Sequence, residues 1–374
     1  MSLIVNVSRE DLLSGLATLQ NITGKKGTIA ILSNVLIQSN NDSLDITATD
    51  LEVGIRNAIP AEIIAPGSIT LPAKKLFEII RETSDDQIHL EEKDNNWVQI
   101  SAQRSNYNLA GMPSDEFPVF PEYKDENLIN IDGYTLKELI DKTIFSVAQE
   151  GESQFNLSGV LLETEEGDND AFIIRMVSSD GHRLSLMETV IDKKLSLEKT
   201  TIIPRKGLNE LRKFCETNES LMIGFDEKQA VIKTDNSVMI IRLMNGDFPD
   251  YRNIINVINK DSFIEIERDV LLHSIKRMNL FTEDRHNAVK FNFKDDIMIL
   301  SSENMDIGNA KEELKINYKG DELLLGFNGR YFVDALNVMK SEKIKTYINS
   351  SESPCLIEGG DDEGFLCIIM PMKI

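Results

Sequence analysis

The sequence predicts an α+β protein made of three similar domains, and three observations carry this prediction. A short strand followed by an amphipathic helix occurs three times, at residues 4–16, 129–140 and 264–275. A second strand and helix follow each of these pairs, at residues 69–80, 202–214 and 323–339. The segments between the helices alternate polar and apolar residues as strands do, for example at 98–102 and 230–234. A repeat of about 130 residues is too long for a solenoid unit and indicates duplicated domains.

Two further segments recur in the same order in every repeat. The first lies between the two strand–helix pairs, at residues 46–50, 177–180 and 300–304. The second contains a methionine close to a proline and ends each repeat, at residues 112–118, 244–249 and 370–372. We therefore expect each repeat to hold two helices and about eight short strands, with the helices packed on one face of a sheet. We place the domain boundaries near residues 125 and 260, which gives domains 1–125, 126–260 and 261–374 joined by short linkers.

The composition indicates a soluble globular chain. Of the 374 residues, 41% are hydrophobic and 27% are charged, which suffices for several cores. No apolar run approaches the roughly 18 residues of a membrane span, and the N-terminus lacks the pattern of a signal peptide. Cys215, Cys355 and Cys367 have no metal-like spacing, so we expect buried thiols in a reducing cytoplasm. The four histidines are scattered, and we expect no metal site and no cofactor.

The net charge of −22 taken alone argues against nucleic acid as a partner, but binding depends on where the basic residues lie. Basic residues cluster on the expected helices of every repeat: Arg9, Lys25, Lys26, Lys74, Lys75 and Arg81; Lys137, Lys142, Arg205, Lys206, Arg212 and Lys213; Arg268, Lys276, Arg277, Arg330 and Lys340. Acidic residues share these helices, so an ordinary mixed-charge surface is the alternative interpretation. A shared basic lining would contact DNA phosphates without reading the base sequence.

Five segments match a known family in order along the whole chain, at residues 49–52, 179–184, 203–207, 246–251 and 370–374. On these segments, which include Ser-Asp-Gly-His-Arg-Leu and the closing Met-Pro-Met, the chain resembles the bacterial sliding clamps, the beta subunits of DNA polymerase III. The resemblance implies a head-to-tail homodimeric ring of six domains, with helices lining the central hole and sheets outside. It also implies that the ring encircles double-stranded DNA, gives processivity in DNA replication and catalyses no reaction of its own.

The resemblance further implies a hydrophobic pocket between the second and third domains. It would bind short peptides of DNA polymerase III alpha, other polymerases, the clamp loader and repair proteins. Its residues would be Leu157, Ser179, Gly181, His182, Arg183, Leu184, Pro249, Asn253, Ile254, Asn328, Tyr331, Pro354, Ile368, Met370, Pro371 and Met372. Methionine and branched aliphatic side chains suit such an adaptable surface. Ser179 and Asn253 depart from a threonine and an arginine that are frequent in the family. Without the resemblance, Met370 and Met372 would be interpreted as part of a buried C-terminal strand.

The DNA contacts and the ring interface also follow from the resemblance. The DNA-binding residues would be Lys26, Lys74, Gln149, Arg205 and Lys206. Lys26 replaces a frequent arginine and loses its bidentate geometry, and Gln154 stands where a basic residue is common. The dimer would form by edge-strand pairing of Tyr107 and Leu109 with the segment near Leu280 and Phe281 of a second copy, which would close exposed sheet edges.

Two other kinds of function remain open. Asp180, His182 and Arg183 lie within four residues and could form a hydrolase or phosphoryl-transfer site with His182 as the general base. However, no nucleophile elbow, phosphate-binding glycine loop or metal-ligand spacing accompanies them. A protein-binding scaffold without DNA contact would fit the strong negative charge. Convergence of the helix lysines and arginines on one surface would favour the clamp over the scaffold.

Overall fold

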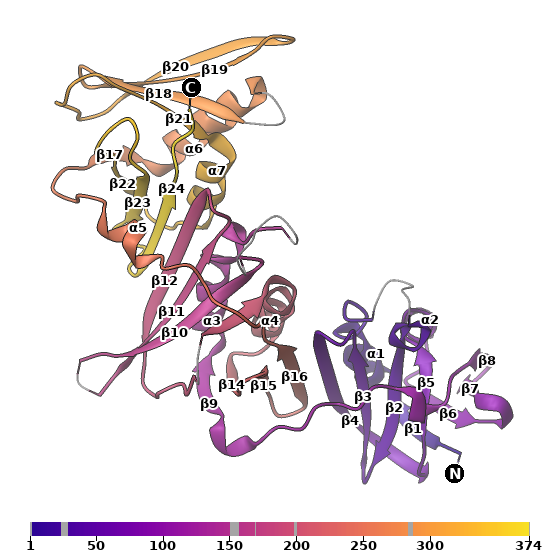
Figure 1. Ribbon diagram of the computed structural model, residues 1–374. Coiled ribbons are helices and arrows are strands. Elements are labelled where there is room, and N and C mark those ends of the chain that lie inside the picture. Colours follow the sequence, from indigo (N-terminus) through magenta and orange to yellow (C-terminus); the bar gives the residue numbers. More distant parts are fainter. Residues whose placement is uncertain are drawn as a thin grey trace. The chain divides into compact units, whose positions relative to one another are not determined.

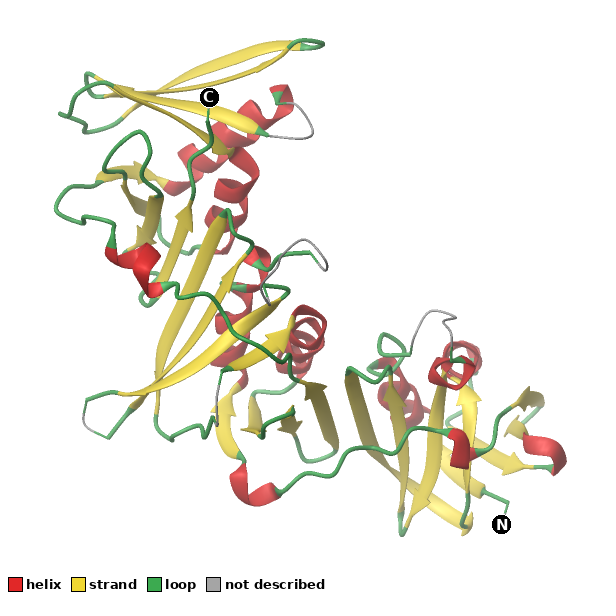
Figure 2. Ribbon diagram, viewed as in Figure 1, coloured by secondary structure: helices red, strands yellow, loops and turns green. Residues whose placement is uncertain are grey.

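The structure is a computed structural model that describes residues 2–23, 29–149, 157–168, 170–197, 200–282 and 287–373. The chain divides into two compact units, each of which is described by itself. Unit 1 comprises Met1–Asp132 and Thr217–Leu243, and unit 2 comprises Gly133–Glu216 and Met244–Ile374. Both units combine helices with antiparallel sheets (Figures 1 and 2), so the predicted α+β class is confirmed.

Unit 1 is built around a twelve-stranded sheet that α1 (Arg9–Ala17) and α2 (Ala73–Glu82) accompany. Its strands are β1 (Ile4–Ser8), β2 (Asn34–Asn40), β3 (Ser43–Thr49), β4 (Val53–Ala65), β5 (Ser68–Pro72), β6 (Gln87–Glu92), β7 (Trp97–Ala102), β8 (Ser105–Ala110), β9 (Ile129–Asp132), β14 (Ser220–Phe225), β15 (Gln229–Lys233) and β16 (Ser237–Arg242). The main path runs β8-β7-β6-β1-β4-β16-β15-β14-β9, while β3, β2 and β5 continue from β4.

Unit 2 contains an eight-stranded sheet in the order β13-β10-β11-β12-β24-β23-β22-β17 and a four-stranded sheet in the order β20-β19-β18-β21. The bounds of these strands are β10 (Gly159–Glu166), β11 (Phe172–Ser179), β12 (Arg183–Ile191), β13 (Thr201–Pro204), β17 (Ile264–Glu267), β18 (Ala288–Lys294), β19 (Ile297–Asn304), β20 (Gly308–Lys315), β21 (Leu323–Asn328), β22 (Lys343–Tyr347), β23 (Cys355–Gly359) and β24 (Phe365–Ile369). The helices are α3 (Gly133–Asp141), α4 (Arg205–Thr217), α5 (Arg252–Asn256), α6 (Arg268–Met278) and α7 (Gly329–Val338). Helices α3 and α7 contact the eight-stranded sheet, and α6 packs against α7 (Figure 1).

The helices form where the sequence offers a capping residue and a periodic apolar stripe. Ser8 caps α1, because its hydroxyl accepts a hydrogen bond from Asp11 N at 3.4 Å. Leu12 and Leu16 on that helix are buried one turn apart. Asn328 caps α7 in the same way by accepting a hydrogen bond from Arg330 N at 3.0 Å. Capping residues and periodic apolar residues in the sequence therefore account for where these helices begin and which face they bury.

Strands of neighbouring repeats pair edge to edge at two places. In unit 1, β4 pairs with β16 of the next repeat, and we call this the β4–β16 junction. In unit 2, β12 pairs with β24, and we call this the β12–β24 junction. Because β16 belongs to the second repeat but joins the sheet of the first, the two compact units do not coincide with the three predicted domains. The domain boundaries therefore remain predictions.

The methionine that ends each repeat has a common structural role. It forms an isolated bridge to the strand before the second helix, and the three bridges are Thr70 with Met112, Ile202 with Met244, and Gly326 with Met372. In each repeat, the bridge thereby attaches the closing segment to a strand of the same repeat. Within the described part of the chain, no helix has the length and apolar character needed to cross a bilayer.

Candidate functional site

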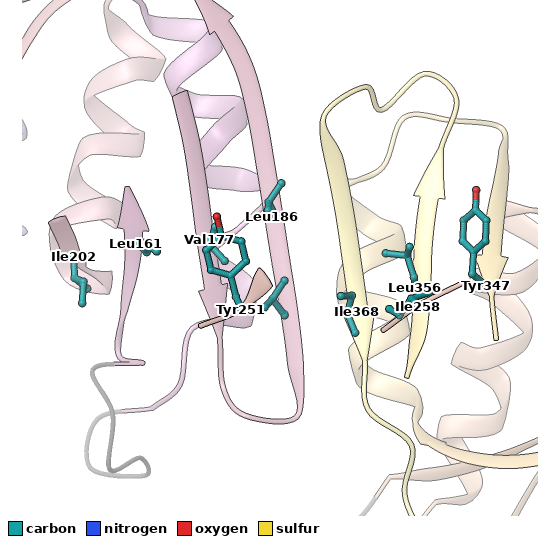
Figure 3. Close-up of a cluster of buried hydrophobic side chains, with 10 residues drawn as sticks. Leu161, Val177, Leu186, Ile202, Tyr251, Ile258, Tyr347, Leu356 and Ile368 are labelled. Atoms are coloured by element: carbon teal, nitrogen blue, oxygen red, sulfur yellow. The ribbon is translucent and has the colours of Figure 1, made fainter. Parts of the chain in front are cut away.

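One face of the eight-stranded sheet of unit 2 carries a continuous row of apolar side chains. Leu161 lies opposite Val177, Val177 opposite Leu186, and the row crosses the β12–β24 junction where Leu184 lies opposite Ile368. The complete buried cluster contains Leu161, Val177, Leu184, Leu186, Ile202, Tyr251, Ile258, Tyr347, Leu356 and Ile368 (Figure 3). The predicted pocket residues Leu184 and Ile368 thus belong to a packed core that both repeats share.

The segment 244–258, which we call the strap, covers this row. Tyr251 and Ile258 on the strap are buried, and Ile254 packs against the same cluster. Figure 3 shows Tyr251 over strands of the second repeat and Ile258 beside Leu356 of the third. The hydroxyl of Tyr251 donates a hydrogen bond to Glu163 at 2.5 Å. Burial, strengthened by this carboxylate, raises the pKa of Tyr251 to about 12.

The remaining predicted strap residues lie at its surface. Asn253 is exposed and donates a hydrogen bond to Asp250 at 2.8 Å. Pro249 is half-buried and lines a cavity of about 470 Å³ together with Leu161 and Tyr251. Of the three strap residues predicted for the pocket, Ile254 is the one that packs against the buried cluster.

The turn between β11 and β12 places Gly181 and His182 at the surface. One carboxylate oxygen of Asp180 accepts hydrogen bonds from the backbone of His182 at 2.9 Å and of Arg183 at 3.0 Å. Gly181 takes a φ of 86°, in the left-handed region that glycine enters without steric cost. Ser179 closes the turn by donating to Arg183 O at 2.8 Å. These bonds give Asp180 and Ser179 roles in holding the turn.

The first repeat contains the same turn without a histidine. Asp50 accepts hydrogen bonds from the backbone of Glu52 at 3.0 Å and of Val53 at 2.8 Å. Thr49 donates to Val53 O at 3.0 Å, as Ser179 donates to Arg183 O in the second repeat. A turn that recurs in this way is a feature of the repeat, and this gives Asp180 a structural explanation that needs no catalytic role.

Arg183 is held on several sides and is only 9% exposed. Its guanidinium donates to Asp180 at 3.0 Å, to Asp334 on α7 at 2.6 Å and to Phe145 O at 2.7 Å. The ring of Tyr331 lies 4.4 Å from the guanidinium carbon. Burial alone would lower the pKa of Arg183, but the hydrogen bond to Asp334 and the charge of Asp180 outweigh it and raise that pKa. Asp334 and Phe145 were not predicted, and the sequence carries no local signal for them.

The C-terminal segment runs beside this turn and makes backbone contacts with both repeats. Met370 N donates to His182 O at 2.9 Å, and Met372 N donates to Gly326 O at 2.8 Å. The side chain of Met370 is 38% exposed, while Pro371 and Met372 are half-buried. The two methionines therefore do not form a fully buried strand, and Met370 offers an apolar side chain to solvent.

The other predicted pocket residues occupy less central places. Asn328 caps α7, one turn ahead of Tyr331. Pro354 is half-buried and directly precedes Cys355, which pairs with Ile369. Leu157 is buried, and its carbonyl accepts a hydrogen bond from Ala148 N at 2.9 Å. Contacts among the described residues thus connect the sheet, the turn, α7 and the C-terminal segment into one apolar region of unit 2.

The predicted DNA-binding residues that the structure describes are all exposed. Lys74 lies in the first turn of α2, Arg205 and Lys206 begin α4, and Gln149 follows the third helix in an irregular segment. Lys26 and Gln154 lie outside the described residues. Among the described residues, no salt bridge joins Lys74 or Arg205 to an acid, although the pKa of Glu78 is lowered by a hydrogen bond from Lys75 and, in part, by the charge of Lys74.

Most other basic residues of the expected helices form ion pairs with acids, some near in sequence and some on other elements. The pairs are Lys75–Glu78, Arg81–Glu82, Lys137–Asp141, Lys142–Asp362, Arg212–Asp141, Lys213–Glu210, Arg268–Asp269, Arg277–Glu312 and Lys340–Glu138. Lys142 is only 2% exposed and is part of the protein interior. Because most of these side chains are paired with acids, fewer of them could line a DNA-binding surface than the number of lysines and arginines indicates.

The structure describes all four residues of the expected dimer interface, Tyr107, Leu109, Leu280 and Phe281. Tyr107 and Leu109 do lie on an edge strand, because β8 ends the sheet order of unit 1. Leu280 and Phe281 instead lie in a 3-10 helix, Asn279–Phe281, which continues α6 and ends where Thr282 donates to Asn279 O at 3.0 Å. This short helix contacts β20, the edge strand of the four-stranded sheet. The edge strand beside Leu280 and Phe281 is therefore β20, and Leu280 is 70% exposed, while the dimer interface itself remains a prediction.

Within the described ranges, no group of three or more histidine, cysteine or acidic side chains has the geometry to hold a metal ion. Cys215, Cys355 and Cys367 are free and buried. Burial raises the pKa of the Cys355 thiol well above its usual range, so this sulfur is not suited to nucleophilic chemistry.

Comparisons with known proteins agree along the whole chain. Models of the DNA polymerase III beta subunit match at residues 1–121 for the N-terminal domain, 130–250 for the central domain and 258–373 for the C-terminal domain. The beta sliding clamp of Haemophilus influenzae is 31% identical over 373 residues, which cover 99% of both chains. The crystal structure of the Caulobacter crescentus beta sliding clamp superposes with a TM-score of 0.93 at 29% identity and covers 100% of both chains. A Pseudomonas aeruginosa sliding clamp bound to griselimycin superposes with a TM-score of 0.88 at 26% identity and also covers 100% of both chains. The chain belongs to the family of bacterial sliding clamps, the beta subunits of DNA polymerase III.

Proposed function

We propose that two copies of this chain close head to tail into a ring around duplex DNA, tether polymerases and other partners there, and catalyse no reaction themselves. The observation that carries the proposal is the pairing rule at the two internal junctions. In each, the fourth strand of one repeat's sheet pairs with the last strand of the next repeat, β4 with β16 and β12 with β24. Applied once more, the rule leaves β20 of one copy to pair with β8 of another.

Both strands are free to do so among the described residues, because β8 pairs only with β7 and β20 only with β19. An unpaired strand edge presents hydrogen-bonding groups that natural proteins cover or pair. Two such head-to-tail contacts between two copies pair both edges of each copy and close the assembly. The same strand order in all three repeats supports the domain boundaries near residues 125 and 260 as part of this proposal.

The internal junctions also define a register. Gly54 and Leu184 occupy equivalent places, because each pairs across its hairpin with an equivalent residue, Thr49 or Ser179. Gly54 pairs with Ile240 in the next repeat and Leu184 pairs with Ile368. Ile240 and Ile368 each stand four residues before the methionine of the closing bridge, Met244 or Met372.

The corresponding residues of the third junction are Asn309 and Asn108. Asn309 pairs across its hairpin with Glu303, the residue of the third repeat that corresponds to Thr49 and Ser179. Asn108 stands four residues before Met112. Pairing Asn309 with Asn108 sets Tyr107 opposite Ala310.

This register also matches the faces of the two strands. Tyr107 shares its face with buried Ile100, the residue opposite it on β7. Ala310 shares its face with Glu312, which accepts a hydrogen bond from Ser274 on α6. Tyr107 therefore lies on the buried face of its sheet and Ala310 on the face that α6 covers, and a slip by one residue would break this agreement.

Cysteine cross-linking tests the register. A chain with Asn108→Cys and Asn309→Cys should form covalently closed dimers under mild oxidation, because the two side chains would lie opposite each other. The three native cysteines are buried and serve as an internal background. The matched control, Asn108→Cys with Lys311→Cys, shifts one partner along the same face and should cross-link far less. Equal cross-linking in the two chains would overturn the register.

Exposed charge on the helices supports the DNA contact. Lys74, Arg205 and Lys206 lie at the starts of α2 and α4, where side chains can reach phosphates without reading bases. Lys26 and Gln149 complete the proposed set. Few available cations are sufficient, because a closed ring is retained by topology even when each contact is weak and sensitive to salt.

We propose the apolar region around Leu184, Ile254, Ile368, Met370 and Met372 as the site where partner peptides bind. It offers an exposed methionine beside a packed aliphatic floor, a combination that accepts varied apolar side chains. The partners would be DNA polymerase III alpha, other polymerases, the clamp loader and repair proteins. Two sites in each ring would raise the effective concentration of one partner near another.

Retention on plasmid DNA tests the proposed function. A ring loaded by its cognate clamp loader should stay on circular plasmid and leave linear plasmid from the ends. Equal retention on both would indicate ordinary DNA binding and would contradict the ring. Absence from both, with loading verified on a known clamp, would favour a scaffold without DNA contact.

A further inference from the structure

We propose that Arg183 and Asp334 form a positioning pin that sets the shape of the peptide site. The inference rests on the proposed peptide-binding function and deepens it. It changes the role that the family resemblance implies for Arg183, from a residue that lines the pocket to one that holds it. It also adds Asp334, a residue outside the predicted site.

The first step is that Arg183 has little capacity left for a ligand. Nε donates to Asp180 at 3.0 Å, Nη1 to Asp334 at 2.6 Å and Nη2 to Phe145 O at 2.7 Å. One face of its guanidinium lies over the Tyr331 ring. The residue is 9% exposed, so a peptide has almost no access to its remaining donors.

The second step is that these contacts meet at elements from two repeats. Asp180 holds the turn that carries Gly181 and His182, and His182 O receives the backbone of Met370. Asp334 and Tyr331 lie one turn apart on α7, which belongs to the third repeat. Arg183 therefore joins the turn, the C-terminal segment and α7 through one planar group.

The third step is that the chemistry requires arginine. A guanidinium donates in fixed directions from one plane and stacks on an aromatic ring, whereas a lysine ammonium does neither. Charge-assisted hydrogen bonds of this kind are short and directional. Lysine at this position would keep the charge but lose the simultaneous contact with Asp180, Asp334 and Tyr331.

The fourth step is that the pin is separable from the fold. The side chain of Asp334 is 42% exposed and is one of three acceptors for Arg183. Its replacement by asparagine leaves Arg183 bound to Asp180 and Phe145 O, so the charge keeps a partner. We therefore expect Asp334→Asn to fold and to let α7 and the Tyr331 ring shift against the turn.

Calorimetric titration with griselimycin, the molecule present in the related Pseudomonas aeruginosa structure, tests the pin. Asp334→Asn and Arg183→Lys should each weaken binding about tenfold, which corresponds to about 1.4 kcal/mol. Asp334→Glu keeps the carboxylate and should restore most of the affinity. Glu342→Gln removes the same charge from an exposed site in the same repeat and should leave the affinity unchanged.

Two further arms separate the pin from a structural effect and from the site itself. Binding is measured well below the melting temperature of every variant, so a purely structural role would lower the melting temperature and leave the affinity unchanged, which would overturn the pin. Met370→Ala with Met372→Ala probes the site directly. If this double variant loses affinity while Asp334→Asn does not, the proposed peptide site is supported and the positioning role is refuted. If the unmodified protein does not bind griselimycin or the methionine variant binds normally, both the proposed site and the positioning role are refuted.

Discussion

The β4–β16 and β12–β24 junctions join strands through ladders of equal length, but their outer faces differ in chemistry. At the β4–β16 junction, Gly54 and Arg56 lie on the outer face, and the Phe120 ring covers them. At the β12–β24 junction, leucine and isoleucine side chains fill that face and the strap covers them. An apolar outer face is therefore not required to connect two repeats. The added apolar surface distinguishes the junction that we propose as a binding site.

The opposite faces differ as well. On the helix side of the β4–β16 junction, Asn57 donates neutral hydrogen bonds to Gly15 O at 2.8 Å and Thr18 at 2.7 Å. On the helix side of the β12–β24 junction, Lys142 and Asp362 form a buried ion pair at 2.8 Å, and the ammonium lies 5.3 Å from the Phe365 ring. Burial alone would raise the pKa of Asp362, but hydrogen bonds from Lys142 and Ser341 outweigh it and lower that pKa.

The largest expected effect comes from breaking this ion pair. Asp362→Asn leaves the charge of Lys142 in the protein interior, where Glu138 at 3.2 Å is its remaining acid. The loss of one partner of a buried pair costs about 3–5 kcal/mol. Hydrogen exchange of the β24 amides should report this as faster opening, with β16 unchanged.

Glu265→Gln is the control for that prediction, because it breaks the exposed pair between Lys343 and Glu265. An exposed pair contributes below about 1 kcal/mol. Equal opening of β24 in the two variants would show that the buried pair does not distinguish the junctions.

The apolar face of the β12–β24 junction gives the next largest effect. Leu186→Ala removes a buried side chain from the cluster and should lower local stability by about 3 kcal/mol. Val238→Ala is the matched change at the β4–β16 junction, where the side chain is half-buried, and should cost about 1 kcal/mol. Hydrogen exchange at β12 and β16 measures both. Similar losses would mean that the outer faces contribute equally despite their composition.

The sequence alone was enough to predict the repeated strands and helices, because each carries its own periodic signal. Ile4 to Leu16 shows this, with alternation in the strand and buried leucines one helical turn apart in α1. The pairing of β4 with β16 had no such signal, since the register of two edges depends on residues that are far apart in the chain.

The candidate site shows the same division. The apolar positions Leu184, Ile368 and Met370 were expected, and the structure joins them in one region. The contacts of Arg183 were not foreseen, because its partners Phe145 and Asp334 are remote in sequence. Asp180 and His182 also looked like a reactive pair by spacing, and only the hydrogen bonds of the turn gave Asp180 another explanation.

The strap should respond to alkaline pH. The pKa of Tyr251 is raised to about 12 in the folded chain, against about 10 when unfolded, so the folded state binds the proton more tightly. Its contribution is complete below pH about 10 and is lost as the pH rises toward 12, an effect of about 2–3 kcal/mol. The melting temperature, measured between pH 8 and 12, should therefore fall more steeply for the unmodified protein than for Tyr251→Phe. Tyr123→Phe, in the first linker, is the control and should follow the unmodified protein.

The smallest effect is expected at the outer face of the β4–β16 junction. Phe120→Ala removes the ring that lies 4.2 Å from the Arg56 guanidinium carbon and covers Gly54, and it should cost about 1 kcal/mol. Val119→Ala next to it is the control, because Val119 is 92% exposed and its side chain contributes little. Hydrogen exchange at β4 and β16 should distinguish the two variants. If Phe120→Ala opened β16 as far as Leu186→Ala opens β12, one ring on the outer face would stabilise its junction as strongly as a buried leucine of the apolar face, and that face would no longer set the β12–β24 junction apart.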